Sequence, residues 1–328
     1  MTTYIIRRIL QAIPTIIGVT IITFIIIQLA PGDPVQILTF QPGMTSEDRE
    51  RLRHELCLDR PVVSQYLIWV FGDWTGECEQ KGLVRGDFGE SFRSRRPVLQ
   101  MFMERIPATL QLTTFAFLIG GFIGLLLGII SAVYRGLAID NVSRFFSVVF
   151  DALPPFWFGI LLIMFFSVQL GWLPVGGRLP INVDEPTIID RIRHLIMPSI
   201  VLGVSWIALM SRYMRAETLE VINQDYIRTA HAKGLRRTTV YLKHVARNAL
   251  IPIVTILGPA ITALVGGAVI IERIFSWPGI GRMTVDAVSQ RDIPVVMAST
   301  IIGAILVILG NLLSDILLVI VDPRIRFD

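Results

Sequence analysis

Six long apolar runs constrain what this 328-residue chain can fold into. A helix of about 20 apolar residues is long enough to cross the ~30 Å hydrocarbon core of a bilayer. The runs cover roughly residues 9–30, 108–134, 145–170, 195–214, 249–271 and 295–321. Apolar residues make up 53% of the chain and charged residues 17%, a balance that soluble domains do not have. We therefore predict an all-α integral membrane protein with six transmembrane helices.

The first apolar run has two interpretations. Arg7 and Arg8 precede it, as basic residues precede the apolar core of a cleaved signal peptide. However, the run is too long for a signal peptide, and residues 29–32 lack a good small-x-small cleavage site. We expect an uncleaved transmembrane helix over residues 1–30.

The distribution of Lys and Arg predicts the orientation, because the short cytoplasmic loops of membrane proteins collect these residues. With the N-terminus inside, the cytoplasmic side carries Arg7, Arg8, Arg135, Arg144, Arg215, Arg228, Lys233, Arg236, Arg237, Lys243, Arg247, Arg324 and Arg326. In the two short outer loops, acidic residues nearly balance the basic ones. We expect both termini in the cytoplasm, and the net charge of +4 reflects this topology rather than nucleic-acid binding.

The polar stretch between the first two runs, residues 31–107, is too long to be a simple connection. It is predicted to form an extracytoplasmic subdomain, with a helix that starts at Thr45 or Ser46 and ends near Leu58. Both cysteines, Cys57 and Cys78, fall in this segment. A disulfide between them would close a loop of about 20 residues and contribute on the order of 3 kcal/mol, but two free thiols are an equal alternative.

Motifs for enzymatic chemistry are missing from the sequence. It contains no phosphate-binding loop of the G-x-x-x-x-G-K-[ST] type, no H-E-x-x-H and no G-x-S-x-G. The cysteines and histidines lack metal-ligand spacing, so we assign no catalytic, cofactor-binding or metal-binding residue. Two acids lie within the runs, Asp151 and Asp315, each near the predicted cytoplasmic end of its run. We expect structural roles for both, as helix caps or ion-pair partners, rather than ion-driven transport.

The segment between the fourth and fifth runs, residues 215–249, is polar and basic. Asn223 or Asp225 is suited to cap the start of a short helix, and Gly234 is suited to end it. Leu219, Ile222 and Tyr226 recur at helical spacing and predict one apolar face. Such a segment either lies on anionic lipid headgroups or docks into the groove of a partner protein. The pattern alone does not decide between these two interpretations.

Two runs carry ridges of small residues, which allow transmembrane helices to approach closely. One ridge is formed by Gly120, Gly124 and Gly128 in the second run. The other is formed by Gly258, Thr262 and Gly266 in the fifth run. Both predict a tight helix bundle or a subunit interface, although Gly is also common in transmembrane helices generally.

The basic segment carries a recognisable motif, D-Y-I-R-T-A-x-A-K-G-L over residues 225–235, followed by H-x-x-R-N-A-L-I-P over residues 244–252. It resembles the signature loop of the inner-membrane permeases of bacterial ABC importers, in particular the dipeptide/oligopeptide permease B family. The likeness extends to P-G-D-P at 31–34, G-D-F-G-x-S at 86–91, F-S-W-P-G-I-G-R at 275–282 and D-P-R-I-R at 322–326. Arg228-Thr229-Ala230 stands where the broader importer motif has Glu-Ala-Ala, a departure that this branch shares.

The resemblance implies a type I ABC importer permease fold with an extracytoplasmic insertion between helices 1 and 2. The implied organisation is an N-terminal transmembrane helix (1–30), the extracytoplasmic subdomain (31–107), a permease domain of five helices (108–321) with its coupling loop at 215–249, and a cytoplasmic tail (322–328). Implied partners are a homologous second permease subunit in a heterodimer, two ABC ATPase subunits that carry ATP and Mg, and an extracytoplasmic substrate-binding protein. The implied location is the bacterial cytoplasmic membrane.

By the same resemblance, the short cytoplasmic helix is a coupling helix that sits in a groove of an ATPase subunit. The implied coupling residues are Asp225, Tyr226, Arg228, Thr229, Ala230, Ala232, Lys233, Gly234 and Leu235. The implied function is ATP-driven import of di- or oligopeptides. Import of nickel, glutathione, opines or oligosaccharides is an alternative, because the same branch carries these cargoes. A non-transport membrane protein, such as an intramembrane enzyme or a lipid-binding scaffold, is a remote alternative.

Overall fold

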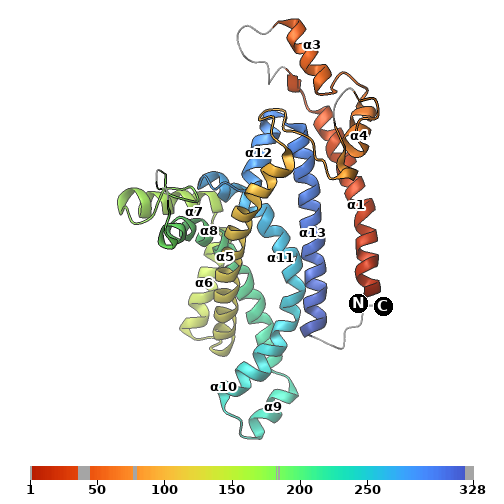
Figure 1. Ribbon diagram of the computed structural model, residues 1–328. Helices are drawn as coiled ribbons and strands as arrows, with labels where there is room; N and C mark the ends of the chain where they lie inside the picture. Colours follow the sequence, from red (N-terminus) through yellow and green to blue (C-terminus); the bar gives the residue numbers. More distant parts are fainter. Residues whose placement is uncertain (1, 36–44, 77–79, 182, 184, 322–328) are drawn as a thin grey trace. The chain divides into compact units, whose positions relative to one another are not determined.

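The computed structural model describes residues 2–35, 45–76, 80–181, 183 and 185–321 (Figure 1). Helices form the regular structure throughout these ranges, and the only strand-like pairing described there is an isolated bridge between Glu90 and Pro97. The chain divides into two compact units, one made of residues 1–107 and 282–308 and the other of residues 108–281 and 309–328.

The first unit contains α1 (Thr2–Leu29), α3 (Ser46–Glu55), α4 (Val62–Phe71), the short 3-10 helix η1 (Leu83–Arg85), most of α12 (Ile280–Gln290) and the start of α13 (Ile293–Val321). Phe24, Trp69, Phe92 and Met297 are buried together in its core. The described part of the predicted extracytoplasmic segment therefore packs on apolar side chains of its own unit.

Helix α3 begins at Ser46, one of the two predicted starts, and Thr45 caps it. Thr45 accepts a hydrogen bond from the Asp48 N–H, and both the N–H and the hydroxyl of Thr45 donate to the Asp48 carboxylate. These bonds hold the pKa of the Asp48 carboxyl below its usual range. The reciprocal pattern is a capping box, which satisfies N–H groups that the first helical turn leaves unpaired.

Cys57 is buried and disulfide-bonded. Cys78 lies outside the described residues, so the pairing of these two cysteines stays a prediction.

The turn between α12 and α13 ties two of the family-like motifs to the first unit. The Asp292 carboxylate accepts hydrogen bonds from the Ser91 hydroxyl, at 2.5 Å, and from the Phe92 N–H, at 3.0 Å. The neighbouring Arg291 guanidinium donates to the backbone carbonyls of Pro31 and Gly32. The P-G-D-P and G-D-F-G-x-S motifs therefore meet the same two-residue turn.

The second unit contains the remaining helices. They are the main part of α5 (Val98–Val133), α6 (Ala138–Ala152), α7 (Pro155–Leu162), the π-helical turn η2 (Ile163–Gln169), α8 (Ile188–Ile222), α9 (Asp225–Ala232), α10 (Arg237–Thr239), the π-helical turn η3 (Val240–Val245), α11 (Ala246–Ile274) and the end of α13. Helix α8 lies at the centre of this unit, and α5, α6 and α11 pack against it. Leu195, Met210 and Met214 of α8 are among its most buried side chains.

The predicted glycine ridge of α5 packs closely on α8. A β-carbon added at Gly120, Gly124 or Gly128 would lie 2.6–2.7 Å from a side-chain carbon of α8. The three opposing residues are Trp206, Met210 and Met214. The tight packing predicted for the second apolar run is thus confirmed. The ridge of the fifth run, from Gly258 to Gly266, falls where the side chains of α11 are not described.

Four of the described helices are long and apolar enough to cross a membrane, within Ile6–Leu29, Val98–Val133, Ile188–Ile222 and Ile293–Leu317. A fifth span is present if α6 and α7 count as one broken span. The span predicted over residues 145–170 is not one continuous helix, because the chain bends by 101° between α6 and α7. Pro154 and Pro155 cause the break, since a proline disfavours helical geometry in the residue before it and Pro155 can start a new helix.

A buried acid organises the F-S-W-P-G-I-G-R motif. Glu272, at the end of α11, is fully buried and accepts a hydrogen bond of 2.7 Å from the Thr109 hydroxyl of α5. A β-carbon at Gly279 would lie only 1.9 Å from a Glu272 carboxylate oxygen. The Trp277 indole N–H donates to the Ala108 carbonyl at 2.8 Å. The glycine is therefore required because the carboxylate occupies the space that a larger residue would fill.

Candidate functional site: the exposed helix α9

Helix α9 forms within the predicted cytoplasmic segment, but its start differs from the prediction. The residue before the helix is Gln224, and no side chain caps it. Asn223 instead donates to the Leu219 carbonyl at 2.8 Å, at the end of α8, and Asp225 is already the first helical residue. The two capping roles predicted for Asn223 and Asp225 are thus wrong, because α8 continues up to Ile222 and uses Asn223 for its own last turn.

The end of α9 agrees with the prediction. Gly234 has a φ of +75°, a left-handed conformation that side chains disfavour. Its N–H donates to the His231 carbonyl at 2.9 Å, and the Leu235 N–H donates to the Ala230 carbonyl at 3.4 Å. These two bonds form a Schellman motif, the common way for a glycine to end a helix. Lys233 precedes the turn, where a cation interacts favourably with the helix dipole.

Two residues attach α9 to the core of the second unit. Ile227 and Ala230 are 1% and 7% exposed, and they belong to the same buried cluster as Val240 and Val245 of η3. The predicted apolar face of Leu219, Ile222 and Tyr226 is therefore incorrect in part, because Tyr226 is 45% exposed. Ile227 is the inward anchor that the sequence pattern did not identify, since Asp225 and Arg228 flank the short apolar pair Tyr226-Ile227 and hide its period.

The rest of α9 is exposed. Of the residues predicted to couple to an ATPase, only Ala230 is buried. The exposed ones are Asp225, Tyr226, Arg228, Thr229, Ala232, Lys233, Gly234 and Leu235. The Arg228 guanidinium lies 3.5 Å from the Asp225 carboxylate, with side chains 76% and 97% exposed, so this pair contributes little to stability. The surface is a short cationic helix end with one exposed aromatic ring.

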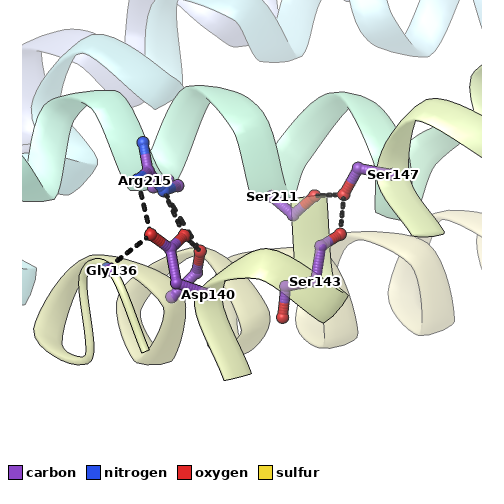
Figure 2. A network of polar contacts seen from close by, with 7 residues as sticks. Gly136, Asp140, Ser143, Ser147, Ser211 and Arg215 are labelled. Atoms are coloured by element: carbon purple, nitrogen blue, oxygen red, sulfur yellow. Dashed lines mark hydrogen bonds and ion pairs between the residues drawn. The ribbon is translucent and has the colours of Figure 1, made fainter. Parts of the chain in front are cut away.

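A polar network joins α8 to α6 at the level of Arg215, on the same helix that leads into α9 (Figure 2). The Arg215 guanidinium donates to both Asp140 carboxylate oxygens, at 2.8 and 2.9 Å. The same carboxylate accepts from the Ser131 hydroxyl at 2.6 Å and from the Gly136 N–H at 2.9 Å. Sequence reasoning placed Arg215 in the cytoplasmic segment but missed its partner, because Asp140 lies 75 positions away.

A second polar contact lies further along α6. The Ser147 and Ser211 hydroxyls are 2.8 Å apart, and Figure 2 shows them pointing toward one another. Beyond them, the Arg212 guanidinium donates to the Asp151 carboxylate at 2.7 Å. The expectation that Asp151 has an ion-pair partner is thereby confirmed. Near Asp315, the Ser314 hydroxyl donates to the Val254 carbonyl at 3.1 Å, and the role of Asp315 itself stays a prediction.

The described residues contain no group of three or more His, Cys, Asp or Glu side chains arranged to hold a metal ion. The site on α9 consists of a helix end, two cations and an aromatic ring. Its residues are suited to bind the surface of another macromolecule.

Two family models match this chain. Residues 124–327 match the binding-protein-dependent transport system inner membrane component, and residues 1–113 match the N-terminal model of such membrane components.

Curated relatives align over almost their full length. The oligopeptide transport system permease protein AppB of Bacillus subtilis is 44% identical over all of both chains. The di/tripeptide transport system permease protein DppB of Pseudomonas aeruginosa is 42% identical over 99% of both. The dipeptide permease DppB of Escherichia coli is 38% identical over 99% of both.

Solved structures share the fold. The MetNI methionine ABC transporter, in inward-facing conformations, has a chain that is 20% identical and matches with a TM-score of 0.54. The match covers 68% of the present chain and 97% of that chain. A second crystal form of the same transporter gives a TM-score of 0.55 at 19% identity.

Proposed function

This chain belongs to the family of binding-protein-dependent transport system inner membrane components, and we propose that it is a peptide importer permease whose helix α9 receives movement from an ATPase subunit. The observation that carries the coupling role is the contrast between the two faces of α9. Ile227 and Ala230 fix the helix to the core, whereas Tyr226, Arg228 and Lys233 are presented outward. A partner that pushes on such a helix moves α8 and α11 with it.

The exposed residues suggest how the partner is held. Tyr226 provides an apolar ring that can fill a pocket, and Arg228 and Lys233 provide cations for acidic or carbonyl groups. Gly234 allows the chain to turn close to the partner without a side chain in the way. The membrane-surface alternative requires an apolar face that lies in the lipid headgroups, but the two buried apolar residues of α9 are already occupied by η3. The geometry thus favours a protein partner.

The assembly that we propose has four kinds of partner. A homologous second permease subunit completes the translocation pathway as a heterodimer, and two ABC ATPase subunits bind ATP and Mg. An extracytoplasmic binding protein delivers the cargo, and the lipid bilayer surrounds the subunits. The chain has the type I importer fold with six spans and both termini in the cytoplasm, and it carries no catalytic residue. Residues 31–107 form the extracytoplasmic subdomain, residues 108–321 the permease domain, and residues 322–328 the cytoplasmic tail.

Peptides are the proposed cargo because the relatives that match over their full length are named as oligopeptide, di/tripeptide and dipeptide permeases. Nickel, glutathione, opines and oligosaccharides remain the alternatives within the same machine. The family match leaves little room for a membrane protein without a transport role.

Co-purification tests the coupling role. The chain is expressed with its ATPase subunits, and the charge-reversed variant Arg228→Glu/Lys233→Glu is compared with the unaltered chain. We expect the variant to reach the membrane but to recover much less ATPase. Arg96→Glu is the control, because Arg96 is an exposed cation on the first unit, where it pairs with Glu104. Equal recovery of ATPase by all three proteins would contradict the assignment of α9.

A further inference from the structure

Helix α6 carries a line of polar residues on the side that packs against α8, whereas Asn141 and Arg144 near its start are exposed. Asp140, Ser143, Ser147 and Asp151 follow one another at spacings of three, four and four residues, and we call them the polar stripe of α6. Three of them contact Arg215, Ser211 and Arg212 of α8. Most of the other exposed residues of α6 are apolar, among them Ile139, Val142, Phe145 and Val148.

The ion pair at the start of this stripe is buried, but the ion pair at its end is exposed. The side chains of Asp140 and Arg215 are 1% and 22% exposed, whereas those of Asp151 and Arg212 are 50% and 43% exposed. Asp151 follows Asp140 by 11 residues of α6, which is a rise of about 16 Å. If α6 runs along the bilayer normal from Asp140 at the cytoplasmic boundary, this rise brings Asp151 up to about halfway through the ~30 Å hydrocarbon core. The sequence indicated a shorter distance between Asp151 and the edge of the bilayer. The apolar run begins near Phe145, whereas α6 already starts at Ala138.

A charged pair at this depth does not face lipid, because ionisable side chains within transmembrane segments face the protein interior or a water-filled cavity. Helix stability does not explain Asp151 either, since an acid in the last turn of a helix interacts unfavourably with the helix dipole. The residue also stands directly before the 101° break between α6 and α7. Broken helices near the middle of the bilayer are a common location of substrate sites in transporters.

The exposed residues of α8 favour the presence of water beside the pair of Arg212 and Asp151. Helix α8 is the most buried of the four long apolar helices, with 72% of its apolar window inside the protein. Its second half nevertheless exposes a line of mainly polar side chains. They are Ser205, Arg212, Tyr213, Ala216 and Glu220. Their spacing places them along one side of the helix, and polar residues on one side of an otherwise apolar helix are expected to line a wet pathway.

We propose that Arg212 and Asp151 form a substrate-contact site in the translocation pathway, where Arg212 binds the α-carboxylate of a peptide and Asp151 binds its α-ammonium group. The charges match a zwitterionic peptide with one group of each sign. A guanidinium carries five N–H donors, so Arg212 can hold Asp151 and a substrate carboxylate together. The two groups lie 2.7 Å apart, so a peptide can reach both of them. This inference rests on the proposed peptide importer function.

Thiol labelling of the complete transporter in proteoliposomes tests whether the site is wet and holds substrate. Ser205→Cys reports on the polar line of α8, and Val148→Cys, on the apolar side of α6, is the matched control. We expect a membrane-impermeant methanethiosulfonate to modify Cys at position 205 but not at 148. A saturating concentration of trialanine should slow the modification of Cys at position 205 by about tenfold. Adding Arg212→Gln should remove this protection by the peptide, because one hydrogen bond to a charged group contributes about tenfold to affinity. No labelling at 205, equal labelling at 148, or protection that survives Arg212→Gln would overturn the proposal.

Peptides with blocked termini test the two charges separately. With the binding protein saturated, uptake of trialanine is compared with uptake of its C-terminal amide and of its N-acetyl derivative. We expect Arg212→Gln to lower the preference for trialanine over its C-terminal amide by about tenfold. Asp151→Asn should lower the preference for trialanine over its N-acetyl derivative by a similar factor. Arg96→Gln, which removes an exposed pair elsewhere, should change neither ratio. If the unaltered transporter takes up no trialanine, the proposed cargo fails; if uptake is normal and both ratios are unchanged in the variants, the substrate site fails.

Discussion

The Asp140 carboxylate receives both hydrogen bonds of the Arg215 guanidinium in a site that leaves Asp140 1% exposed. The Ser131 hydroxyl and the Gly136 N–H occupy the same two oxygens. This contact fixes α6 to α8 only ten residues before α9 begins, so it joins α6 to the helix that leads into α9.

Removing the cation of this buried pair should be costly. We expect Arg215→Met to destabilise the protein by about 3 kcal/mol, because the buried Asp140 carboxylate is left with an unpaired charge. Arg212→Met should change stability by less than about 1 kcal/mol, since its partner is exposed. Thermal unfolding in detergent measures both. Adding Asp140→Asn to Arg215→Met should recover part of the loss, and an equal effect of the two Met variants would contradict the difference in burial.

The turn at Gly234 should be sensitive to substitution. Proline cannot adopt a φ of +75° and lacks the N–H that bonds to His231. We therefore expect Gly234→Pro, and likewise Gly234→Asp, to leave the protein inserted in the membrane but to abolish peptide uptake. Uptake in proteoliposomes and membrane content are measured together. Gly171→Asp is the control, because Gly171 also has a positive φ, of +64°, with open space around it. Normal uptake by the Gly234 variants would refute the coupling role.

The contact between Gly279 and Glu272 predicts a specific rescue. We expect Gly279→Ala to destabilise the protein by about 2 kcal/mol, because the added carbon overlaps the Glu272 carboxylate. Glu272→Ala removes the obstacle, so the double variant should be more stable than the sum of the single effects predicts. Unfolding of all three variants by heat measures this difference. Gly303→Ala, where a β-carbon meets nothing within 4 Å, should be neutral or stabilising.

The cysteines allow a test of their pairing. If Cys57 and Cys78 are bonded, then Cys57→Ala, Cys78→Ala and the double variant should each lose about 3 kcal/mol, because each opens the same loop of about 20 residues. Mild reduction of the unaltered protein should give a loss of the same size. Additive losses in the double variant would show that the two residues do not act as a pair.

The extracytoplasmic subdomain is predicted to receive the binding protein. Helix α3 has no buried residue, so its surface is available for contact. We expect replacement of residues 46–55 by a flexible linker to weaken docking of the binding protein without reducing ATPase recovery. Sedimentation of the binding protein with proteoliposomes measures docking. The reverse pattern, normal docking with loss of ATPase, would refute this role.

The sequence allowed prediction of the features that depend on local patterns. Apolar length located the helices, and the glycine at 234 located the end of α9, because these signals act over a few neighbouring residues. The pairing of Asp140 with Arg215 was not predictable, since it depends on the tertiary packing of α6 on α8. The break at Pro154 was not predicted, because the run stays apolar on both sides of it. The length of an apolar run does not show where a helix bends.

The orientation of α6 also limits how this protein can be made. An isolated α6 would expose its polar stripe to lipid, and ionisable residues within a transmembrane segment are costly to insert. The side chains that shield the stripe belong to α8, and Arg215 is translated 75 residues after Asp140. We therefore expect α6 to enter the lipid together with α8, and not before it, during synthesis.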